Sequence, residues 1–375
     1  MKTTFTAVRA NLLAGLKSVK GAIDGNGIDA LFGYVKIDTL GNDSVLISAC
    51  NGRSLVTSRV MCQVHDAGKA ALVAGNKLLA FVAALPEGLV DMDLEHSVTM
   101  AKVTGGETSF SVSRRDVADF MALTMPDGEG VTFTVKAMAL AEMIRKTRFA
   151  AAGTGDARAV LRGIFLEIKG GLLTLTAADG RRLSTVEHEV TATGDCQAIL
   201  PIDACDNVSR LIRQYDFEGD VDVRVTATRC SFTSRLWSLT TVLVEGAFPN
   251  WRMIIPKDGS VTVELRKVDR KMMLECLACA MLAMKADEKN VKIKVTRGRI
   301  YFSSRSPMGV CATTMPTEWD GADFELNVNP ELLRDVLNAI DEENVKIDLI
   351  SPTTPIVVTC GVPYLSIVQP MSLEG

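Results

Sequence analysis

Hydrophobic positions along this chain predict a short amphipathic helix about every 65 residues, six times in all. In the first helix, Leu12, Leu16 and Val19 recur at spacings of three and four, which places them on one face. A recurrence of this kind is typical of a protein built from repeated supersecondary units. The six helices are expected to begin near Ala7, Gly75, Lys136, Pro201, Arg266 and Asn329.

Strand-like segments follow each predicted helix. After the first helix they occupy residues 33–38, 44–49 and 54–64, each with alternating or β-branched residues. A short strand also precedes each later helix. Asn76 is expected to cap the second helix, and Pro86-Glu87-Gly88 to end it.

Grouping the units in pairs predicts three similar domains, each of two βαβββ units, at residues 1–126, 127–256 and 257–375. Turn residues interrupt the pattern at both boundaries. Short connections between strands predict mainly antiparallel sheets with helices on one face, hence the α+β class. Three unrelated α+β domains of coinciding length are the alternative.

The predicted helices differ in charge from the rest of the chain. They carry sixteen Lys and Arg against seven Asp and Glu, a net of plus nine, whereas the whole chain is −4. An acidic protein with basic charge on one recurring element is suited to present that element to a polyanion.

Composition narrows the class of protein. Hydrophobic residues make up 47% of the chain and there is no low-complexity tract, so a folded protein is expected. No apolar run approaches the roughly 20 residues of a membrane helix, and no signal-peptide core follows Met1. We therefore expect a cytoplasmic protein without membrane association.

Cysteines and histidines do not predict a metal site or a cofactor. The nine cysteines are odd in number and lack framework spacing, which favours reduced thiols. Cys276 and Cys279 are expected to be small buried side chains, with metal or redox chemistry as the alternative. His65, His96 and His188 share no ligand spacing and are expected to be solvated.

Catalytic motifs are not found in the sequence either. Gly25-Asn26-Gly27 lacks the later glycine of a phosphate-binding loop, and no Ser-His-Asp arrangement can be argued. An enzyme is therefore the less favoured class.

The packing distance between helices sets the size of a ring that could surround a polyanion. Six helices packed about 9 Å apart in a closed ring leave a bore of roughly 7 Å, but twelve leave roughly 24 Å. A duplex about 20 Å across fits the larger bore. The arithmetic favours two chains per ring, related by a two-fold axis.

Basic side chains on these helices would face the phosphates of such a duplex. Phosphate contacts carry no sequence information, so the expected partner is double-stranded DNA bound without sequence preference. For each residue a solvated surface charge is the alternative. The predicted DNA-binding residues are Arg9, Lys17, Lys20, Arg145, Lys146, Arg148, Arg210, Arg213 and Lys271.

Short motifs along the whole chain form a familiar series. They include Leu85-Pro86-Glu87-Gly88, Ala178-Asp179-Gly180-Arg181-Arg182-Leu183, Phe248-Pro249-Asn250-Trp251-Arg252, Asn329-Pro330, Glu343-Asn344-Val345 and Pro370-Met371-Ser372-Leu373. Each is weak alone, but in this order they resemble the bacterial DNA polymerase III sliding clamp (beta subunit) family.

The resemblance implies a DNA clamp fold: a head-to-tail homodimeric ring with helices lining the bore and sheets outside. It implies a processivity factor without a catalytic centre, which tethers the DNA polymerase III alpha subunit, the clamp loader and other clamp-binding-motif proteins. A diverged interaction scaffold of clamp fold that does not load on DNA is the alternative. Residues 155–160 depart from the family's DNA-contacting residues.

The resemblance also implies two protein-binding surfaces. At the subunit joint, Phe110 and Val112 on an edge strand would face the partner's Met281 and Leu282. A mainly apolar groove between the second and third domains would accept the anchors of a short linear peptide. The implied groove residues are Leu161, Gly180, Arg182, Leu183, Pro249, Met253, Ile254, Ile367, Pro370, Met371 and Leu373.

Overall fold

The structure is a computed structural model of the 375-residue chain. It describes residues 2–24, 30–120, 123–124, 130–215, 218–256, 261–284, 289–361 and 363–371.

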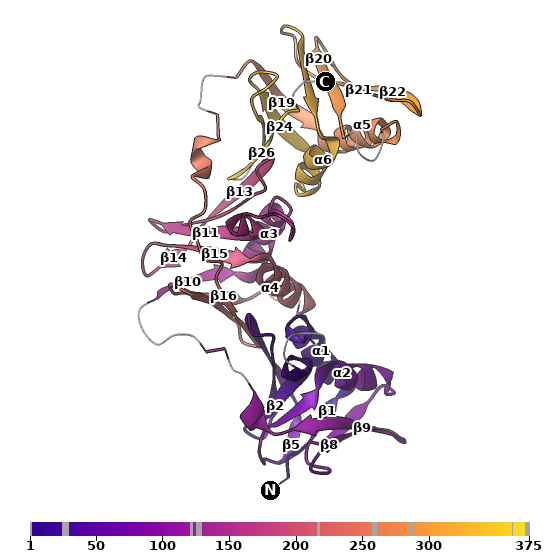
Figure 1. Cartoon of the computed structure of the whole chain (residues 1–375), viewed down its shortest axis with the longest axis vertical. Helices are drawn as coiled ribbons and strands as arrows, with labels where there is room; N and C mark the ends of the chain where they lie inside the picture. The colour runs from indigo at the N-terminus through magenta and orange to yellow at the C-terminus, as the bar shows by residue number, and fades with distance from the viewer. Residues whose placement is uncertain are drawn as a thin grey trace. The chain divides into compact units, whose positions relative to one another are not determined.

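One βαβββ order recurs six times along the described chain, as the sequence predicts (Figure 1). The first repeat is β1 (Thr4–Val8), α1 (Arg9–Val19), β2 (Tyr34–Leu40), β3 (Ser44–Cys50) and β4 (Ser54–Met61). The second is β6 (Ala71–Ala74), α2 (Gly75–Ala84), β7 (Leu89–Asp93), β8 (Met100–Gly105) and β9 (Thr108–Arg115). The third is β10 (Val131–Lys136), α3 (Ala137–Arg148), β11 (Gly163–Lys169), β12 (Leu172–Ala178) and β13 (Arg182–Glu189).

The later repeats keep the same order. The fourth is β15 (Cys196–Pro201), α4 (Ile202–Gln214), β16 (Asp220–Val225), β17 (Arg229–Thr233) and β18 (Trp237–Val242). The fifth is β19 (Val263–Asp269), α5 (Arg270–Leu282), β20 (Val291–Thr296), β21 (Arg299–Ser306) and β22 (Gly309–Pro316). The sixth is β23 (Phe324–Val328), α6 (Pro330–Asn338), β24 (Asn344–Leu349), β25 (Ile356–Cys360) and β26 (Tyr364–Val368). Two short strands lie outside the repeats, β5 (Gln63–Asp66) and β14 (Thr191–Ala192).

The chain divides into two compact units. Unit 1 comprises Met1–Ala141 and Val190–Leu243, and unit 2 comprises Glu142–Glu189 and Val244–Gly375. In unit 1 the strand order is β14-β10-β16-β17-β18-β4-β3-β2-β6-β9-β8-β7-β1-β5. In unit 2 one sheet has the order β22-β21-β20-β23, and a second contains β11-β12-β13-β26-β25-β24-β19. Neighbouring strands in these orders run antiparallel, which confirms the predicted α+β class.

Each unit builds its core by packing helices against these sheets. In unit 1, α1 lies on β3 and β4, and Leu12, Leu16 and Val19 are fully buried as their spacing predicts. Burying such a side chain contributes about 1.5–3 kcal/mol. A Cβ atom at Gly15 would come within 2.2 Å of Val60, so glycine permits this close helix–strand approach. In unit 2, α5 packs against β21 and β22.

Three predictions about local structure are wrong. Asn76 does not cap α2, because the helix already begins at Gly75 and Asn76 lies inside it. Residues 54–64, predicted as one strand, divide into β4 and β5. Cys279 is exposed, although Cys276 is buried as predicted.

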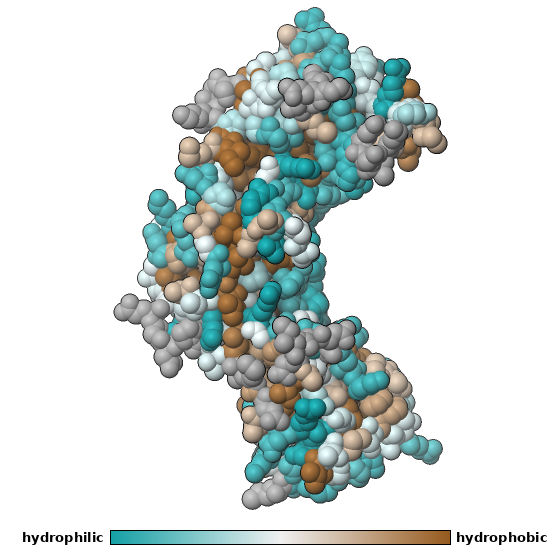
Figure 2. Space-filling model, in the orientation of Figure 1, coloured by the Kyte–Doolittle hydropathy of each residue, from teal (hydrophilic) through white to brown (hydrophobic). Residues whose placement is uncertain are grey.

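The exterior of both units is mainly hydrophilic, with apolar surface gathered in separate patches (Figure 2). Across the helices that the structure describes, none is both long and apolar enough to cross a membrane.

Candidate functional site

A tight turn between β12 and β13 forms one wall of a groove in unit 2. The Asp179 carboxylate accepts hydrogen bonds from the backbone N–H of Arg181 at 2.8 Å and of Arg182 at 2.9 Å. Gly180 takes φ +86°, a conformation that a residue with a side chain rarely adopts. The Asp-Gly-Arg-Arg sequence therefore fixes the turn locally, before any distant contact forms.

Two adjoining hollows make up the groove, and both include Arg181 and Gln369. The first hollow has a volume of about 60 Å³ and is lined by Ala178, Gly180, Arg181, Arg182, Leu183, Ile254, Pro355, Ile367 and Gln369. The second has a volume of about 300 Å³ and is lined by Arg181, Asn329, Leu332, Gln369, Pro370 and Met371. Backbone bonds hold their shared wall, since the N–H of Gln369 donates to the carbonyl of Arg181 at 2.7 Å.

Most predicted groove residues line these hollows. Gly180, Arg182, Leu183, Ile254 and Ile367 line the first, and Pro370 and Met371 line the second. Three predicted residues line neither: Leu161, which is buried, and Pro249 and Met253, which are exposed. Leu373 lies outside the described residues.

Sequence reasoning missed part of the lining. Pro355 comes from the loop before β25 and Leu332 from α6, so only the folded chain brings them to the Asp179 turn. Arg181, Gln369 and Asn329 stand within or beside the family motifs, which could have pointed to them.

Charged side chains stiffen the rim of the first hollow. Arg182 donates to Asp335 on α6 at 2.6 Å and to Asp179 at 3.0 Å, so its charge is neutralised. Arg158 donates to Asp156 and to the carbonyl of Asp179, and its hydrogen bonds lower the pKa of Asp156 to about 2. A Cβ at position 180 would lie 2.9 Å from the Arg158 guanidinium. The loop 155–160 therefore supports this rim through Arg158.

In unit 1, two of the predicted DNA-binding arginines bond to backbone carbonyls. Arg9 donates to the carbonyl oxygens of Val82 and Ala83, at the C-terminal end of α2, and pairs with Glu87. Arg210 donates to the carbonyls of Lys17 and Ser18, both at 2.7 Å. Both side chains thus donate to backbone carbonyls near the C-terminal ends of helices.

The other cations of this unit are exposed. Lys17, Lys20 and Arg213 lie on the surface of α1, the adjoining turn and α4, and none of the three pairs with a carboxylate among the described residues. They are available to an outside anion.

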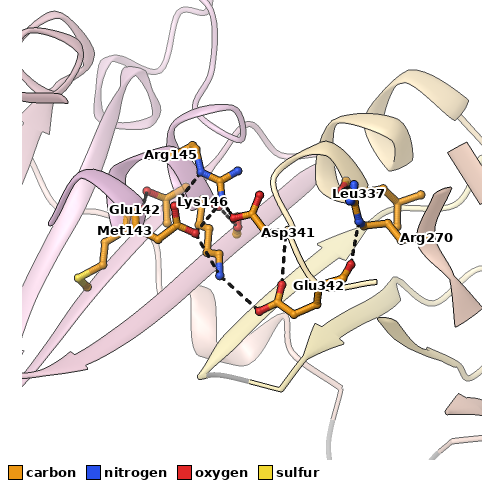
Figure 3. Close-up of polar contacts among 10 residues, drawn as sticks. Glu142, Met143, Arg145, Lys146, Arg270, Leu337, Asp341 and Glu342 are labelled. Atoms are coloured by element: carbon orange, nitrogen blue, oxygen red, sulfur yellow. Dashed lines mark hydrogen bonds and ion pairs between the residues drawn. The ribbon is translucent and has the colours of Figure 1, made fainter. Parts of the chain in front are cut away.

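In unit 2, carboxylates surround Arg145 and Lys146. Figure 3 shows both side chains directed from α3 toward Asp341 and Glu342, which follow α6. Arg145 pairs with Glu142 at 2.6 Å and also with Asp341. Lys146, with only 7% of its side chain exposed, pairs with Glu142 at 3.3 Å and Glu342 at 3.8 Å.

This cluster also affects protonation. Partial burial alone would raise the pKa of Glu142, but hydrogen bonds and charge from Arg145 and Lys146 lower it below its ordinary value. Arg145 and Lys146, which the sequence predicted to contact DNA, are therefore already paired with carboxylates of their own chain. The remaining predicted cations of unit 2, Arg148 and Lys271, are exposed.

The residues predicted for the subunit joint lie on two different surfaces. β9 pairs with β6 only through Arg114 and Arg115, so residues 108–113 have one strand neighbour, β8, in the described structure. Phe110 on this edge stacks on Phe81 with ring centroids 4.4 Å apart, and Val112 is buried. Leu282, at the end of α5, is 88% exposed. An open strand edge and an exposed apolar helix end are both suited to a protein contact.

The described residues offer little to a catalytic mechanism. No group of three or more His, Cys, Asp or Glu residues among them could hold a metal ion. Burial raises the pKa of the Cys50, Cys230 and Cys276 thiols, and mainly burial raises that of Cys62 to about 11. Such thiols stay protonated near neutral pH and are weak nucleophiles.

Comparison with known families gives consecutive matches. The model of the DNA polymerase III beta subunit, central domain, matches residues 134–250. The model of its C-terminal domain matches residues 252–363. The two matches together span more than half of the chain.

Two relatives that align over about nine-tenths of the chain are both beta sliding clamps. The beta sliding clamp of Pseudomonas aeruginosa is 26% identical over 352 residues, which cover 91% of this chain and 92% of the relative. That of Escherichia coli K12 is 26% identical over 349 residues, 92% of each chain.

Solved structures establish the fold. The DNA polymerase III beta subunit of Thermotoga maritima superposes with a TM-score of 0.90 at 23% identity, over 99% of this chain and 100% of that one. A sliding clamp of P. aeruginosa bound to griselimycin gives a TM-score of 0.90 at 24% identity over both whole chains. Since both domain models describe one subunit and its relatives align over nine-tenths of the sequence, the chain belongs to the bacterial DNA polymerase III beta sliding clamp family, as a diverged member that functions as a sliding clamp.

Proposed function

We propose that two copies of this chain close head to tail into a ring around duplex DNA and that the ring tethers replication and repair proteins. The six βαβββ repeats carry this proposal, because a ring of twelve similar helices has a bore that accepts a duplex. Within each chain the repeats would form three domains, at 1–126, 127–256 and 257–375. The consecutive matches to a central and a C-terminal domain support this division.

Duplex DNA would be held by diffuse charge rather than by fixed contacts. Lys17, Lys20, Arg213 and Lys271 are the strongest candidates, because they are exposed and have no carboxylate partner among the described residues. Arg148 is exposed as well. Arg9, Arg145, Lys146 and Arg210 already bond to their own chain and would contribute to the field more than to direct contact. Such contacts are independent of sequence and weaken steeply with salt.

The groove would bind an extended peptide through two apolar anchors. One anchor would enter the first hollow against Leu183 and Ile367, and the other the second hollow against Pro370 and Met371. The DNA polymerase III alpha subunit, the clamp loader and other clamp-binding-motif proteins would supply such peptides. The chain would act in the cytoplasm without catalysing a reaction itself.

The subunit joint provides a direct test of the ring. Wild-type protein should sediment as a dimer at micromolar concentration, and Leu282→Asp should dissociate it, because a carboxylate would be buried against the partner's edge strand. Leu282 is exposed in the single chain, so the variant should remain folded. A monomeric wild type, or a dimeric Leu282→Asp variant, would contradict this joint.

A matched pair of methionines tests the groove. Met371→Ala should weaken binding of a polymerase tail peptide by about tenfold, measured by fluorescence anisotropy. Met253→Ala is the control, because Met253 is 80% exposed and lines neither hollow. Equal effects of the two changes would remove the groove from the proposal.

A further inference from the structure

A pocket of about 490 Å³ lies on the four-stranded sheet of unit 2, and none of its described lining residues lines the peptide groove. We call it the sheet pocket. Figure 2 shows mainly hydrophilic surface at the end of the unit where Figure 1 places β20 and β21. The residues that line the sheet pocket are Asn290, Lys292, Ser303, Ser304, Arg305, Val310 and Asn327.

Strand register places the polar side chains of the sheet pocket side by side. Lys292 on β20 is the partner of Ser303 on β21 and of Asn327 on β23, so the three form one row across the sheet. Side chains of directly paired residues are about 5 Å apart. Arg305 lies two residues beyond Ser303 and shares its face. The row and Arg305 can therefore contact one small ligand together.

The opposite face of the same sheet holds the core. Ile300 and Phe302 are buried there, and the Ser304 hydroxyl donates to the carbonyl of Ala280 on α5 at 2.6 Å. The alternation along β21 thus directs Ser303 and Arg305 away from α5.

Two donors that line the sheet pocket have partners, since Lys292 pairs with Glu325 and the Ser304 hydroxyl donates to the carbonyl of Ala280. Among the described residues no carboxylate lines the pocket, and Arg305 is exposed with no side-chain hydrogen bond or ion pair. Asn327, which is 5% exposed, lines the pocket on the same face as Lys292 and Ser303, so its side-chain amide is within reach of a ligand there.

We propose that the sheet pocket binds a carboxylate-bearing segment of a partner protein. The Arg305 fork, the Lys292 ammonium and the Asn327 amide are the donors that carboxylates accept from. Val310, which is 65% exposed, lines the pocket, and the neighbouring Met308 is 89% exposed. These side chains give the aliphatic part of a peptide an apolar contact that a phosphodiester chain would not use.

A polypeptide is preferred to DNA for a further reason. The sheet pocket faces away from α5, whereas the proposed function places DNA against the helices. This preference rests on the proposed function, but the carboxylate site itself rests on the row and on Arg305.

Glu325 sets the strength of the site. Its carboxylate pairs with Lys292 at 2.5 Å and with Lys294 at 3.3 Å, so it competes with an incoming carboxylate for the Lys292 charge. Removing this charge should strengthen ligand binding rather than weaken it.

Fluorescence anisotropy of a labelled peptide of alternating glutamate and valine tests the proposal on the full-length protein. Arg305→Ala should weaken binding by about tenfold, and Glu325→Gln should strengthen it severalfold. Lys294→Ala is the matched control for Lys292→Ala, because Lys294 lies on the same face of β20 but does not line the pocket. Only the change at 292 should weaken binding.

Three results would overturn the proposal. Arg305→Ala could leave peptide affinity unchanged, it could reduce affinity for a short DNA duplex by as much as affinity for the peptide, or it could dissociate the dimer in sedimentation, which would assign the pocket to the subunit joint. Peptide binding is measured without DNA, so it can fail while the ring holds, and the ring can fail while the peptide binds.

Discussion

Two pairs of helices use their basic side chains in opposite ways. Between α1 and α4 in unit 1, Arg210 bonds to the neutral carbonyls of Lys17 and Ser18 and Gln214 to that of Ala14. Between α3 and the residues after α6 in unit 2, Arg145 and Lys146 meet Glu142, Asp341 and Glu342. The carbonyl acceptors in unit 1 leave the positive charge of Arg210 uncompensated, whereas the carboxylates in unit 2 neutralise the charges of Arg145 and Lys146. The net charge of a helix read from sequence therefore overstates what unit 2 presents to DNA.

The largest expected effect is on the stability of unit 1. Arg210→Ala should lower the free energy of unfolding by about 2–3 kcal/mol, because it removes the charged hydrogen bonds that Arg210 donates to two carbonyls of α1. This loss of unfolding free energy should be the same between about pH 4 and pH 9, since the acceptors are backbone carbonyls, which do not titrate. Urea unfolding followed by circular dichroism measures it.

Arg213→Ala is the control for that change. Arg213 lies on the same helix but is exposed, so its removal should change stability by less than about 0.5 kcal/mol. Equal losses from the two substitutions would mean that the carbonyl contacts of Arg210 do not join α1 to α4.

In unit 2 we expect a smaller loss of unfolding free energy, with a different pH dependence. Glu142→Gln should cost about 1–2 kcal/mol at neutral pH, because it removes one carboxylate from the Arg145 and Lys146 pairs. The folded pKa of Glu142 lies below its ordinary value of 4.5, so the unfolded chain binds more protons between the two values. The stabilisation should be complete above the ordinary value and disappear as the pH falls through the folded one.

Urea unfolding at a series of pH values checks this prediction. The difference between wild type and Glu142→Gln should shrink in acid, whereas that between wild type and Arg210→Ala should not. A difference for Glu142→Gln that is unchanged in acid would show that packing, not charge, accounts for it.

The variant with the smallest expected effect on stability should have the clearest effect on the salt dependence of DNA binding. Lys17→Ala with Lys20→Ala should change unfolding by less than about 0.5 kcal/mol. The same variant should lower the slope of log affinity against log salt by about 2, roughly 0.9 for each lost phosphate contact. Arg145→Ala should leave that slope nearly unchanged. An equal reduction of the slope in both variants would contradict the claim that the two helix pairs differ in the charge they offer to DNA.

Local pattern was enough to predict the repeat but not these contacts. The predicted starts at Gly75 and near Asn329 agree with α2 and α6, because apolar spacing and helix-ending residues are local signals. The partners of Arg210 are 192 and 193 residues away in sequence, and Asp341 is 196 residues from Arg145. No local rule specifies such pairings.

The groove shows the same division. The turn at Asp179 and Gly180 is encoded by adjacent residues, and the family resemblance supplied Leu183, Ile254 and Ile367. Pro355 joins them only through the pairing of β13 with β26 and of β26 with β25. Met253 was assigned to the groove by the family resemblance, yet its side chain is 80% exposed and lines neither hollow.

Retention on DNA tests the clamp most directly. Protein loaded by a bacterial clamp loader onto a nicked circular duplex should remain bound through gel filtration in high salt, and cutting the circle once should release it. A ring held by topology predicts this difference, since salt of about 0.5 M screens the phosphate contacts. Equal retention on circular and linear DNA would mean that the chain adheres to DNA by charge alone and does not encircle it.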